Sequence, residues 1–373
     1  MDTVTTKTSS QQPKLKVDWR ELRKQKQQSK HEKELKRVRK AEEEEEKCHE
    51  KEKRKKEEKI LGIHQTVSIA VPASIVNNAQ SAELKTYLIG QVARACVIFN
   101  CDEIIVYDEY STLENVDIEI LRKDHRTRCI AQMVRVLQYL ECPQYLRKYL
   151  FPIHEDLQYA GLLNPIDSPH HLKEYDKFQF REGVVTDRIS PDNDGSYVNI
   201  GLRKEILIPQ SLSPGLRVTV ELDLEAKNKK KMRGIPVSPS DPRKRTGRYW
   251  GYSVRVASTF SSVFSECPYS SYDLTIGTSE RGESVDAALL KIPSNYEHAL
   301  IVFGGLKGIE AAIDADETYL NIQDSSKIFN YYINTCPNQG SNTIRTEEAI
   351  LITLSALRSK LPISACTPLR AFT

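Results

Sequence analysis

The sequence has no C-x-x-C pair and no Cys/His cluster at zinc-ligand spacing, although it contains eight cysteines in 373 residues. It also has no apolar run of the roughly 18 residues that a membrane-spanning helix needs, and no signal peptide at its start. These absences argue against a zinc-ribbon protein, a membrane-spanning protein and a secreted disulfide scaffold. We expect reduced thiols and no metal, with a disulfide or metal site as the alternative.

Excess positive charge is absent from most of the chain. The net charge is +3, but residues 1–59 hold 20 Lys/Arg against 14 Asp/Glu, which leaves 34 against 37 in the remainder. Electrostatic attraction of nucleic acid must therefore come from the first 59 residues and from local patches of the body.

Residues 1–59 also have few large apolar side chains and are rich in Lys, Glu and Gln. Such a segment cannot bury enough apolar surface to offset the entropy lost on ordering. We expect a disordered tail or a solvated helix. Its basic runs at 33–40 and 51–56 are typical of a nuclear-import signal or an RNA-binding arm, and a merely solubilising helix explains them equally well.

The body begins with an α/β pattern. Residues 66–72 and 103–107 are apolar runs typical of buried strands, and residues 81–100 have the four-residue apolar spacing of a helix. A strand, a helix and a strand in about 45 residues predict a βαβ unit, and so a parallel sheet. A further helix is predicted over 126–149, with an interruption at Pro143.

The pattern changes after about residue 172. Short alternating strands are predicted at 183–187, 197–201, 205–209 and 217–222, separated by turns such as Asn193-Asp194-Gly195. This spacing is typical of a small β-barrel such as an OB-fold. Residues 227–248 follow it with nine Lys/Arg and one acid, Asp241. We interpret this strip as a basic surface for RNA, with a solvated loop as the alternative.

The α/β pattern returns from residue 249. Strands are predicted at 252–257, 273–277, 299–303 and 329–334, and helices at 283–291 and 346–357. The sequence thus divides into a charged tail (1–59), a first α/β part (60–172), an inserted OB-fold-like barrel (173–248) and a second α/β part (249–373).

Three loops follow the predicted strands of this last part: 277–282, 304–308 and 334–343. Ligands of open parallel sheets bind beyond the carboxyl ends of the strands, where glycine lets backbone amides come close. We therefore predict a small-molecule site, although tight turns alone would explain Gly304 and Gly305. Beyond the last loop, Thr346 is placed to cap the C-terminal helix, with Glu347 and Glu348 in its first turn.

These three segments carry a resemblance. The stretches Asp273–Gly282, Ile301–Gly308 and Asn334–Gly340, the last continued by Arg345–Ala349, resemble the SPOUT (α/β-knot) RNA methyltransferase family of eukaryotes and archaea, known in animals also as a centromere- and spindle-associated protein. The resemblance covers roughly residues 60–360.

The resemblance implies a Rossmann-like parallel sheet whose C-terminal segment forms a trefoil knot, with S-adenosylmethionine bound among the three loops of a homodimer. The cofactor-binding residues carried over by position are Arg281, Gly304, Gly305, Asn334, Thr335, Gly340 and Thr343. Arg281 and Arg345 are the candidates to position a phosphate or stabilise a developing anion, and Glu347 is the candidate base. Glu347 could instead serve only as an N-terminal helix charge.

The predicted function is S-adenosylmethionine-dependent methylation of ribosomal or other nuclear RNA, with N3 of uridine as the first expectation from barrel-bearing relatives. RNA is then the partner, and the nucleus, including the nucleolus, is the predicted location, with spindle or kinetochore association in mitosis. The cytoplasm stays open. The alternative is a non-catalytic adaptor that keeps the knotted fold.

Overall fold

The computed structural model describes residues 62–111, 113, 117–123, 127–189, 195–222, 233–322 and 324–362. All of them belong to one compact unit that begins at Leu61. The predicted tail, the turn residues Asn193 and Asp194, and the part of the basic strip before Arg233 lie outside the described residues. Within the described residues, none of the helices has the length and apolar character required to cross a membrane.

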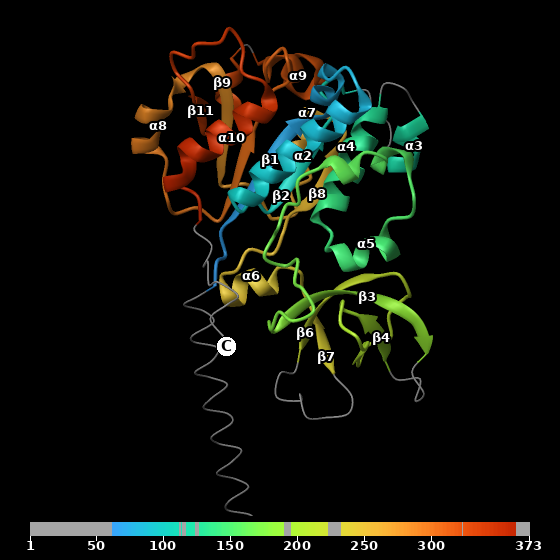
Figure 1. The fold of residues 1–373 in the computed structure, drawn as a ribbon. Helices are drawn as coiled ribbons and strands as arrows, with labels where there is room; N and C mark the ends of the chain where they lie inside the picture. Colours follow the sequence, from blue (N-terminus) through green and yellow to red (C-terminus); the bar gives the residue numbers. More distant parts are fainter. Residues whose placement is uncertain are drawn as a thin grey trace, which may run out of the picture. The chain divides into compact units, whose positions relative to one another are not determined.

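Six strands form one parallel sheet in the order β11-β9-β10-β1-β2-β8 (Figure 1). They are β1 (Thr66–Pro72), β2 (Glu103–Tyr107), β8 (Ser253–Ala257), β9 (Leu274–Ser284), β10 (His298–Val302) and β11 (Tyr331–Asn334). Every neighbouring pair is parallel. The predicted parallel sheet is confirmed.

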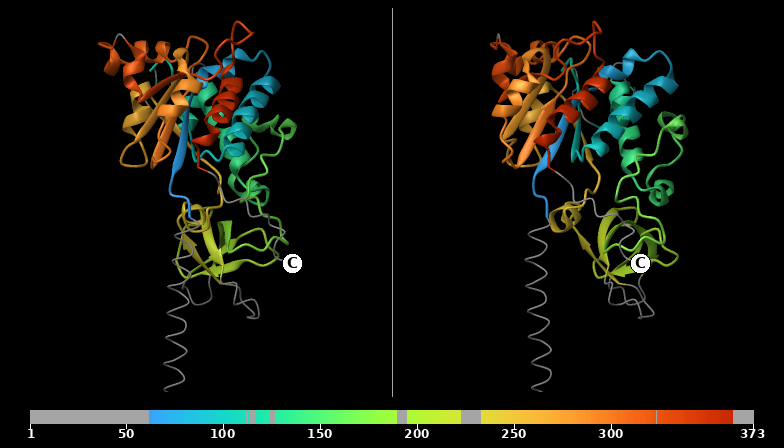
Figure 2. Two further views of the ribbon diagram at one scale, coloured as in Figure 1. Left: turned by 90° about the vertical axis from the view of Figure 1, so that its left-hand side faces the viewer. Right: turned by 60° about the vertical axis from the view of Figure 1, so that its left-hand side comes forward.

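Helices cover both faces of this sheet (Figure 2). On one face, α2 (Ala82–Ile98), α4 (Arg128–Glu141), α8 (Val285–Lys291) and α10 (Thr346–Ala356) share one apolar core with Val67, Ile69 and Val71 of β1. On the other face, α7 (Phe260–Ser265) and α9 (Glu310–Ala315) pack against Ala70. This alternation along β1 is what a strand buried on both faces requires.

The helix ends follow from local chemistry. The Ser81 hydroxyl accepts a hydrogen bond from the backbone N–H of Leu84 at 3.3 Å and so caps α2. Pro143 separates α4 from α5 (Gln144–Leu150), as predicted. The other helices are short: η1 (Ala73–Asn78), α3 (Ile118–Lys123), η2 (Glu155–Leu157), η3 (Ala160–Leu162), α6 (Asp241–Thr246), η5 (Glu317–Tyr319), η6 (Ser325–Ile328) and η7 (Leu357–Ser359).

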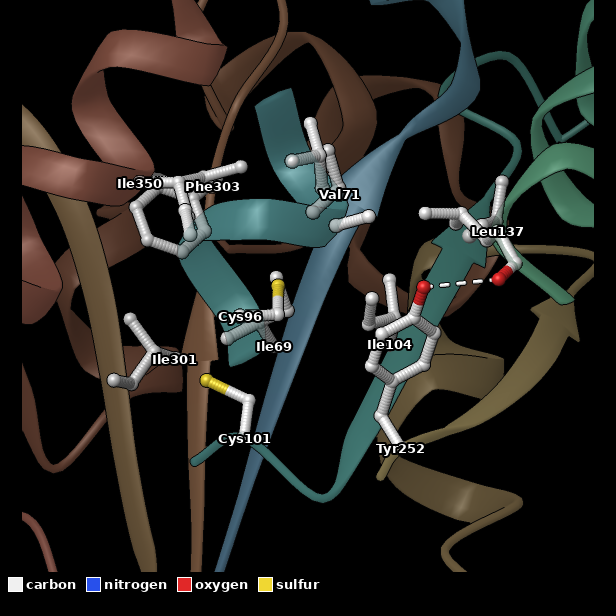
Figure 3. Close-up of a cluster of buried hydrophobic side chains, with 14 of the residues drawn as sticks. Ile69, Val71, Cys96, Cys101, Ile104, Leu137, Tyr252, Ile301, Phe303 and Ile350 are labelled. Atoms are coloured by element: carbon white, nitrogen blue, oxygen red, sulfur yellow. Dashed lines mark hydrogen bonds between the residues drawn. The ribbon is translucent and has the colours of Figure 1, made fainter. Parts of the chain in front are cut away.

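The core between β1, β2 and the helices is apolar and contains few buried side-chain hydrogen bonds. Figure 3 shows Cys96 and Cys101 among Ile69, Ile104 and other buried side chains. The Tyr252 hydroxyl donates to the backbone carbonyl of Leu137 at 2.9 Å, which satisfies a buried phenol. All six cysteines among the described residues are free.

A second, antiparallel sheet has the order β5-β4-β3-β6-β7. Its strands are β3 (Phe180–Ile189), β4 (Ser196–Asn199), β5 (Ile206–Ile208), β6 (Arg217–Leu222) and β7 (Gly234–Val237). A parallel bridge between Leu207 and Arg233 joins the two edges, so the sheet closes nearly into a barrel. Its strands come between β2 and β8, which are neighbours in the parallel sheet.

The described part of the basic strip is ordered structure, so the alternative of a solvated loop is wrong for that part. It forms β7 and α6, and two of its arginines are used internally. Arg243 is buried and its guanidinium lies 2.6 Å from Asp102, while Arg245 makes two 2.8 Å hydrogen bonds to the Glu221 carboxylate. Both acids lie outside the strip, so its local composition gave no sign of these pairs.

An ionic network joins the barrel to the parallel-sheet part. Arg217 of β6 binds Glu141 at the end of α4 through two hydrogen bonds of 2.6 and 3.0 Å, and Glu182 of β3 through one of 2.8 Å. Burial opposes ionisation of Glu141, but Arg217 and His170 together hold its pKa well below the usual range. Trp250 Nε1–H donates to Glu182 at 2.7 Å.

The barrel side of this network lies at the amino ends of the parallel strands. One cavity of about 870 Å³ is lined both by Glu182 and Arg217 of the barrel and by Thr66, Ser253 and His298, the first residues of β1, β8 and β10. The charged groups Glu141, Arg217 and Glu182 on its wall are paired with one another, which accounts for them structurally.

Candidate functional site

A second cavity, of about 700 Å³, lies at the opposite, carboxyl ends of β9, β10 and β11. Residues of all three predicted loops line it. Of the predicted site residues, the structure brings together Arg281, Gly304, Gly305, Asn334, Thr335, Thr343, Arg345 and Glu347 on its wall. Gly340 does not line the cavity, and a Cβ there would meet no heavy atom within 4 Å. This end of a parallel sheet is where ligands of such folds bind.

The first predicted loop is a bulge within a longer strand, which corrects the predicted end of that strand. β9 continues to Ser284, but Tyr332 of β11 pairs with Gly277 and the next residue, Ile333, with Glu283. The residues between them are therefore left unpaired by β11. Gly282 permits the return of the chain, because a Cβ there would lie 2.6 Å from the Cα of Ile333.

The bulge carries Arg281 toward the cavity. The Arg281 side chain is 76% exposed, and its Nη1 lies 3.9 Å from Glu310 Oε1. The same carboxylate oxygen accepts a 3.0 Å hydrogen bond from the hydroxyl of Tyr332. Burial raises the pKa of Tyr332 to about 12, so its phenol remains a donor at neutral pH. The Asn334 amide donates to the Glu280 carbonyl at 2.9 Å, which ties the bulge to the end of β11.

The second loop presents backbone to the cavity. Gly308 has a positive φ of 81°, and its N–H donates to the Gly305 carbonyl at 3.1 Å, which closes a tight turn. A Cβ on Gly304 would lie 2.8 Å from the Cα of Gly308, and one on Gly305 would lie 2.6 Å from Glu109 Oε1. The glycines are thus required by close packing as well as available to a ligand.

Sequence reasoning missed the groups beneath this loop. Glu109 is buried, and one of its carboxylate oxygens accepts a 2.5 Å hydrogen bond from the Ser74 hydroxyl. Glu310 also went unnoticed, although its place two residues after Gly308 and before an apolar run marks a helix start. Glu109 directly follows the β2 strand pattern, which would have been a usable signal.

The third loop is held to the second by the C-terminal helix. Arg345, and not Thr346, is the N-cap of α10, and the Glu348 carboxylate accepts a 2.9 Å hydrogen bond from the Arg345 backbone N–H. The predicted cap at Thr346 is therefore wrong. Its hydroxyl donates instead to the Gly304 carbonyl at 2.9 Å.

Asn334 and Thr335 begin the third loop. The Asn334 side-chain oxygen accepts from the Cys336 N–H at 3.0 Å, which turns the chain directly after β11. The Thr335 hydroxyl lies 3.0 Å from that of Thr353 in α10. Both side chains therefore hold the third loop in place, and this position also puts them on the cavity wall.

The wall carries both signs of charge. Arg281, Lys307 and Arg345 provide positive charge, and Glu280, Glu310 and Glu347 provide negative charge. Among the described residues, no group of three or more His, Cys, Asp or Glu is arranged to hold a metal ion. The cavity is thus suited to a ligand that combines cationic and anionic groups.

Comparison with known proteins decides the family. A family profile described as "Putative RNA methyltransferase" matches residues 66–357, which include both sheets and all three loops. The chain belongs to this RNA methyltransferase family. The prediction of an RNA methyltransferase is confirmed, and the reaction of this methyltransferase requires a methyl donor.

Curated relatives of the methyltransferase agree with this assignment. A human protein named "28S rRNA (uridine-N(3))-methyltransferase" is 53% identical over 310 residues, covering 82% of this chain and 81% of its own. A mouse protein of the same name is 54% identical over 299 residues, covering 79% and 77%. A Caenorhabditis elegans protein named "Putative methyltransferase spot-1" is 36% identical over 368 residues, covering 93% and 92%.

Proposed function

We propose that this chain methylates N3 of a uridine in ribosomal RNA, with S-adenosylmethionine as the methyl donor in the 700 Å³ cavity. The observation that carries the proposal is the convergence of the β9 bulge and the loops after β10 and β11 on that cavity in a member of an RNA methyltransferase family. The human and mouse relatives are named for the same atom and the same class of RNA.

The residues present suit this cofactor. Gly304 and Gly305 bring main chain without side chains of its own to the cavity wall, which fits a flat adenine ring held by main-chain hydrogen bonds. Asn334, Thr335 and Thr343 supply polar groups on the opposite loop, and Arg281 supplies a charge for a carboxylate. Gly340 would act through the shape of its loop. S-adenosylmethionine, when bound, supplies a methyl group activated by a sulfonium centre.

The chain itself must remove a proton and stabilise the charge that remains. N3 of uracil carries a hydrogen, so methylation there needs its loss, and the negative charge spreads onto the adjacent carbonyl oxygens. Glu347 is the proposed base, and Arg345 and Arg281 are proposed to stabilise the anion or hold a phosphate. Because the N-cap hydrogen bond uses the Arg345 backbone, the Arg345 side chain is available for this role.

The homodimer is also part of the proposal. Three large, exposed apolar side chains line a groove between α2 and α10, namely Tyr87 (45%), Ile98 (51%) and Leu351 (46%). Such a patch supports an interface with a second copy. Glu347 lines both this groove and the cofactor cavity, so a second copy seated there would border the site.

Several features of the resemblance extend the proposal. We infer that the C-terminal segment forms a trefoil knot, that the near-barrel is an OB-fold, and that the domains divide at residues 60, 173 and 249. The barrel order, with its parallel bridge at Leu207, supports the OB-fold. Action on ribosomal RNA favours the nucleus and nucleolus. Association with the spindle or kinetochore stays a prediction.

The test combines binding with mapping of the product. We expect S-adenosylhomocysteine to bind the purified protein in calorimetry, and ribosomal RNA from cells lacking the protein to lose one N3-methyluridine that the wild type restores. Arg345→Ala should fail to restore it while keeping S-adenosylhomocysteine affinity within a few-fold. Arg358→Ala, an exposed arginine just beyond α10, is the matched control. Absence of binding at millimolar ligand would favour the non-catalytic adaptor, and full restoration by Arg345→Ala would reject the assignment of that residue.

A further inference from the structure

Two arginines in the described part of the basic strip are poor candidates for binding RNA, because Arg243 and Arg245 are paired with Asp102 and Glu221. Arg243 also donates to the Gln65 carbonyl at 3.0 Å. An arginine that satisfies buried groups is a poor phosphate ligand, since withdrawing it leaves an uncompensated charge behind. Arg233 and Lys244 are the exposed basic residues of the described part of the strip, so a larger contact with RNA needs other residues of the barrel as well.

The outward face of β4 offers such residues. Along β4, Ser196 and Val198 point into the barrel, so Tyr197 and Asn199 face outward. The Asn199 amide donates to the hydroxyl of Tyr149 in α5 at 2.9 Å, and the Tyr149 side chain is 47% exposed. The Arg188 guanidinium of β3 lies over the Tyr197 ring at 4.3 Å. These four residues are contiguous, and we call Tyr149, Arg188, Tyr197 and Asn199 the β4 platform.

Cations accompany the aromatic rings of the platform. Lys148 Nζ lies 4.7 Å from the Tyr149 ring centre, as Arg188 lies over Tyr197. The Arg188 side chain is 63% exposed, and its pairing with Glu205 at 3.4 Å is a weak surface contact. Among the described residues of the flanking strands and turns, Lys148, Arg188, Arg203 and Lys204 stand against Glu174, Asp187 and Glu205, and Arg188 and Arg203 are paired with Glu205 and Glu174. The described part of the platform is therefore mainly aromatic, with little net charge.

The position of the β4 platform in the sheet also supports RNA binding. β4 is the second of five antiparallel strands in chain order, and its partner β5 is the third. In small barrels of this order, the face formed by the second and third strands is the one that binds oligonucleotides. The Tyr149 ring is exposed and the Tyr197 ring is partly exposed on this face, and such rings stack on unpaired bases, while Arg188 suits a phosphate.

We propose that the β4 platform binds a single-stranded segment of the RNA substrate by stacking bases on Tyr149 and Tyr197. The proposal rests on the proposed function, because it assigns a second contact for the same RNA, away from the cofactor cavity. Single-stranded RNA is the fitting partner, since bases within a duplex have no free face for a tyrosine ring.

The experiment measures binding of the full chain to a labelled oligouridine of about 12 nucleotides, a length within the range of one small barrel. Replacing both tyrosines, Tyr149→Ala with Tyr197→Ala, should weaken binding at least about tenfold. The matched variant with Tyr149→Phe and Tyr197→Phe keeps both rings and should bind within about twofold of wild type. Arg188→Gln should lower the slope of log affinity against log salt by about 0.7, the value for one phosphate contact on a single strand.

Three results would overturn the platform. They are alanine variants that bind like wild type, phenylalanine variants that lose as much as the alanine ones, and a duplex of the same length that competes equally well. Arg188→Gln leaves both rings in place, so it tests the surface even if the alanine pair lowers stability. S-adenosylhomocysteine affinity should be unchanged in every variant. Tyrosine-dependent RNA binding without methyl transfer by the wild type would refute the proposed function and leave the platform standing.

Discussion

Replacing Arg217 by methionine should destabilise the protein strongly, because this one side chain neutralises two buried carboxylates. Glu141 and Glu182 have side chains only 8% and 3% exposed, and Arg217 binds both. Removing one partner of a buried ion pair typically costs about 3–5 kcal/mol, since it leaves an uncompensated charge. Because 31% of the Arg217 side chain is exposed, we expect the lower end, about 3 kcal/mol.

The assay is thermal unfolding followed by circular dichroism. At roughly 2 °C per kcal/mol for a chain of this size, Arg217→Met should lower the Tm by about 6 °C. The triple variant with Glu141→Gln and Glu182→Gln removes the stranded charges, and it should recover at least half of that loss. Arg203→Met is the matched control, because its pair with Glu174 is exposed on both sides and should change the Tm by less than about 1 °C.

Two outcomes would refute this account of the network. A loss of less than about 2 °C in Arg217→Met would mean that the carboxylates are not held as buried anions. A triple variant no more stable than the single one would mean that Arg217 acts through packing of its aliphatic stem and not through its charge.

Three further predictions concern the site and the pH range. Thr346→Val removes the donor to the Gly304 carbonyl and should lower stability by about 1 kcal/mol in urea unfolding, whereas Thr346→Ser should match wild type. Gly282→Ala should weaken S-adenosylhomocysteine binding at least about tenfold in calorimetry, because its methyl group would displace the Ile333 backbone and with it the bulge that carries Arg281. Burial lowers the pKa of His171 to about 3 in the folded protein, whereas the histidine of the unfolded chain takes up a proton below about pH 6.5. The free energy of unfolding should therefore fall with falling pH, by about 2 kcal/mol at pH 5. A urea midpoint that does not change between pH 7 and 5 would contradict this.

The parallel sheet could be predicted because a strand that is buried on both faces has a short run of apolar residues. β1 and β2 have the predicted bounds, and Pro143 separates two helices as expected. β7 was missed because Gly234 and Pro236 break the alternating pattern of a strand. β7 forms by pairing with β6, and the sequence of β7 alone does not reveal this partner.

The candidate site was predictable to the level of loops and not of contacts. Glycines and polar residues after buried strands identified the cavity wall, because parallel strands end at one edge. The Thr346 hydroxyl was misassigned, since a cap and a tertiary hydrogen bond to Gly304 look alike in sequence. The bulge of β9 also escaped notice, because it depends on where β11 resumes its pairing.

The cavity and the barrel lie at opposite ends of the parallel sheet, and this separation sets a minimum size for an efficient substrate. A five-residue strand such as β10 spans about 16 Å, so a nucleotide in the cavity and one at the barrel of the same chain are at least that far apart. A short oligonucleotide reaches only one of them at a time. Substrates long enough to reach both gain the benefit of linked binding, and kcat/KM should rise with RNA length until that span is covered.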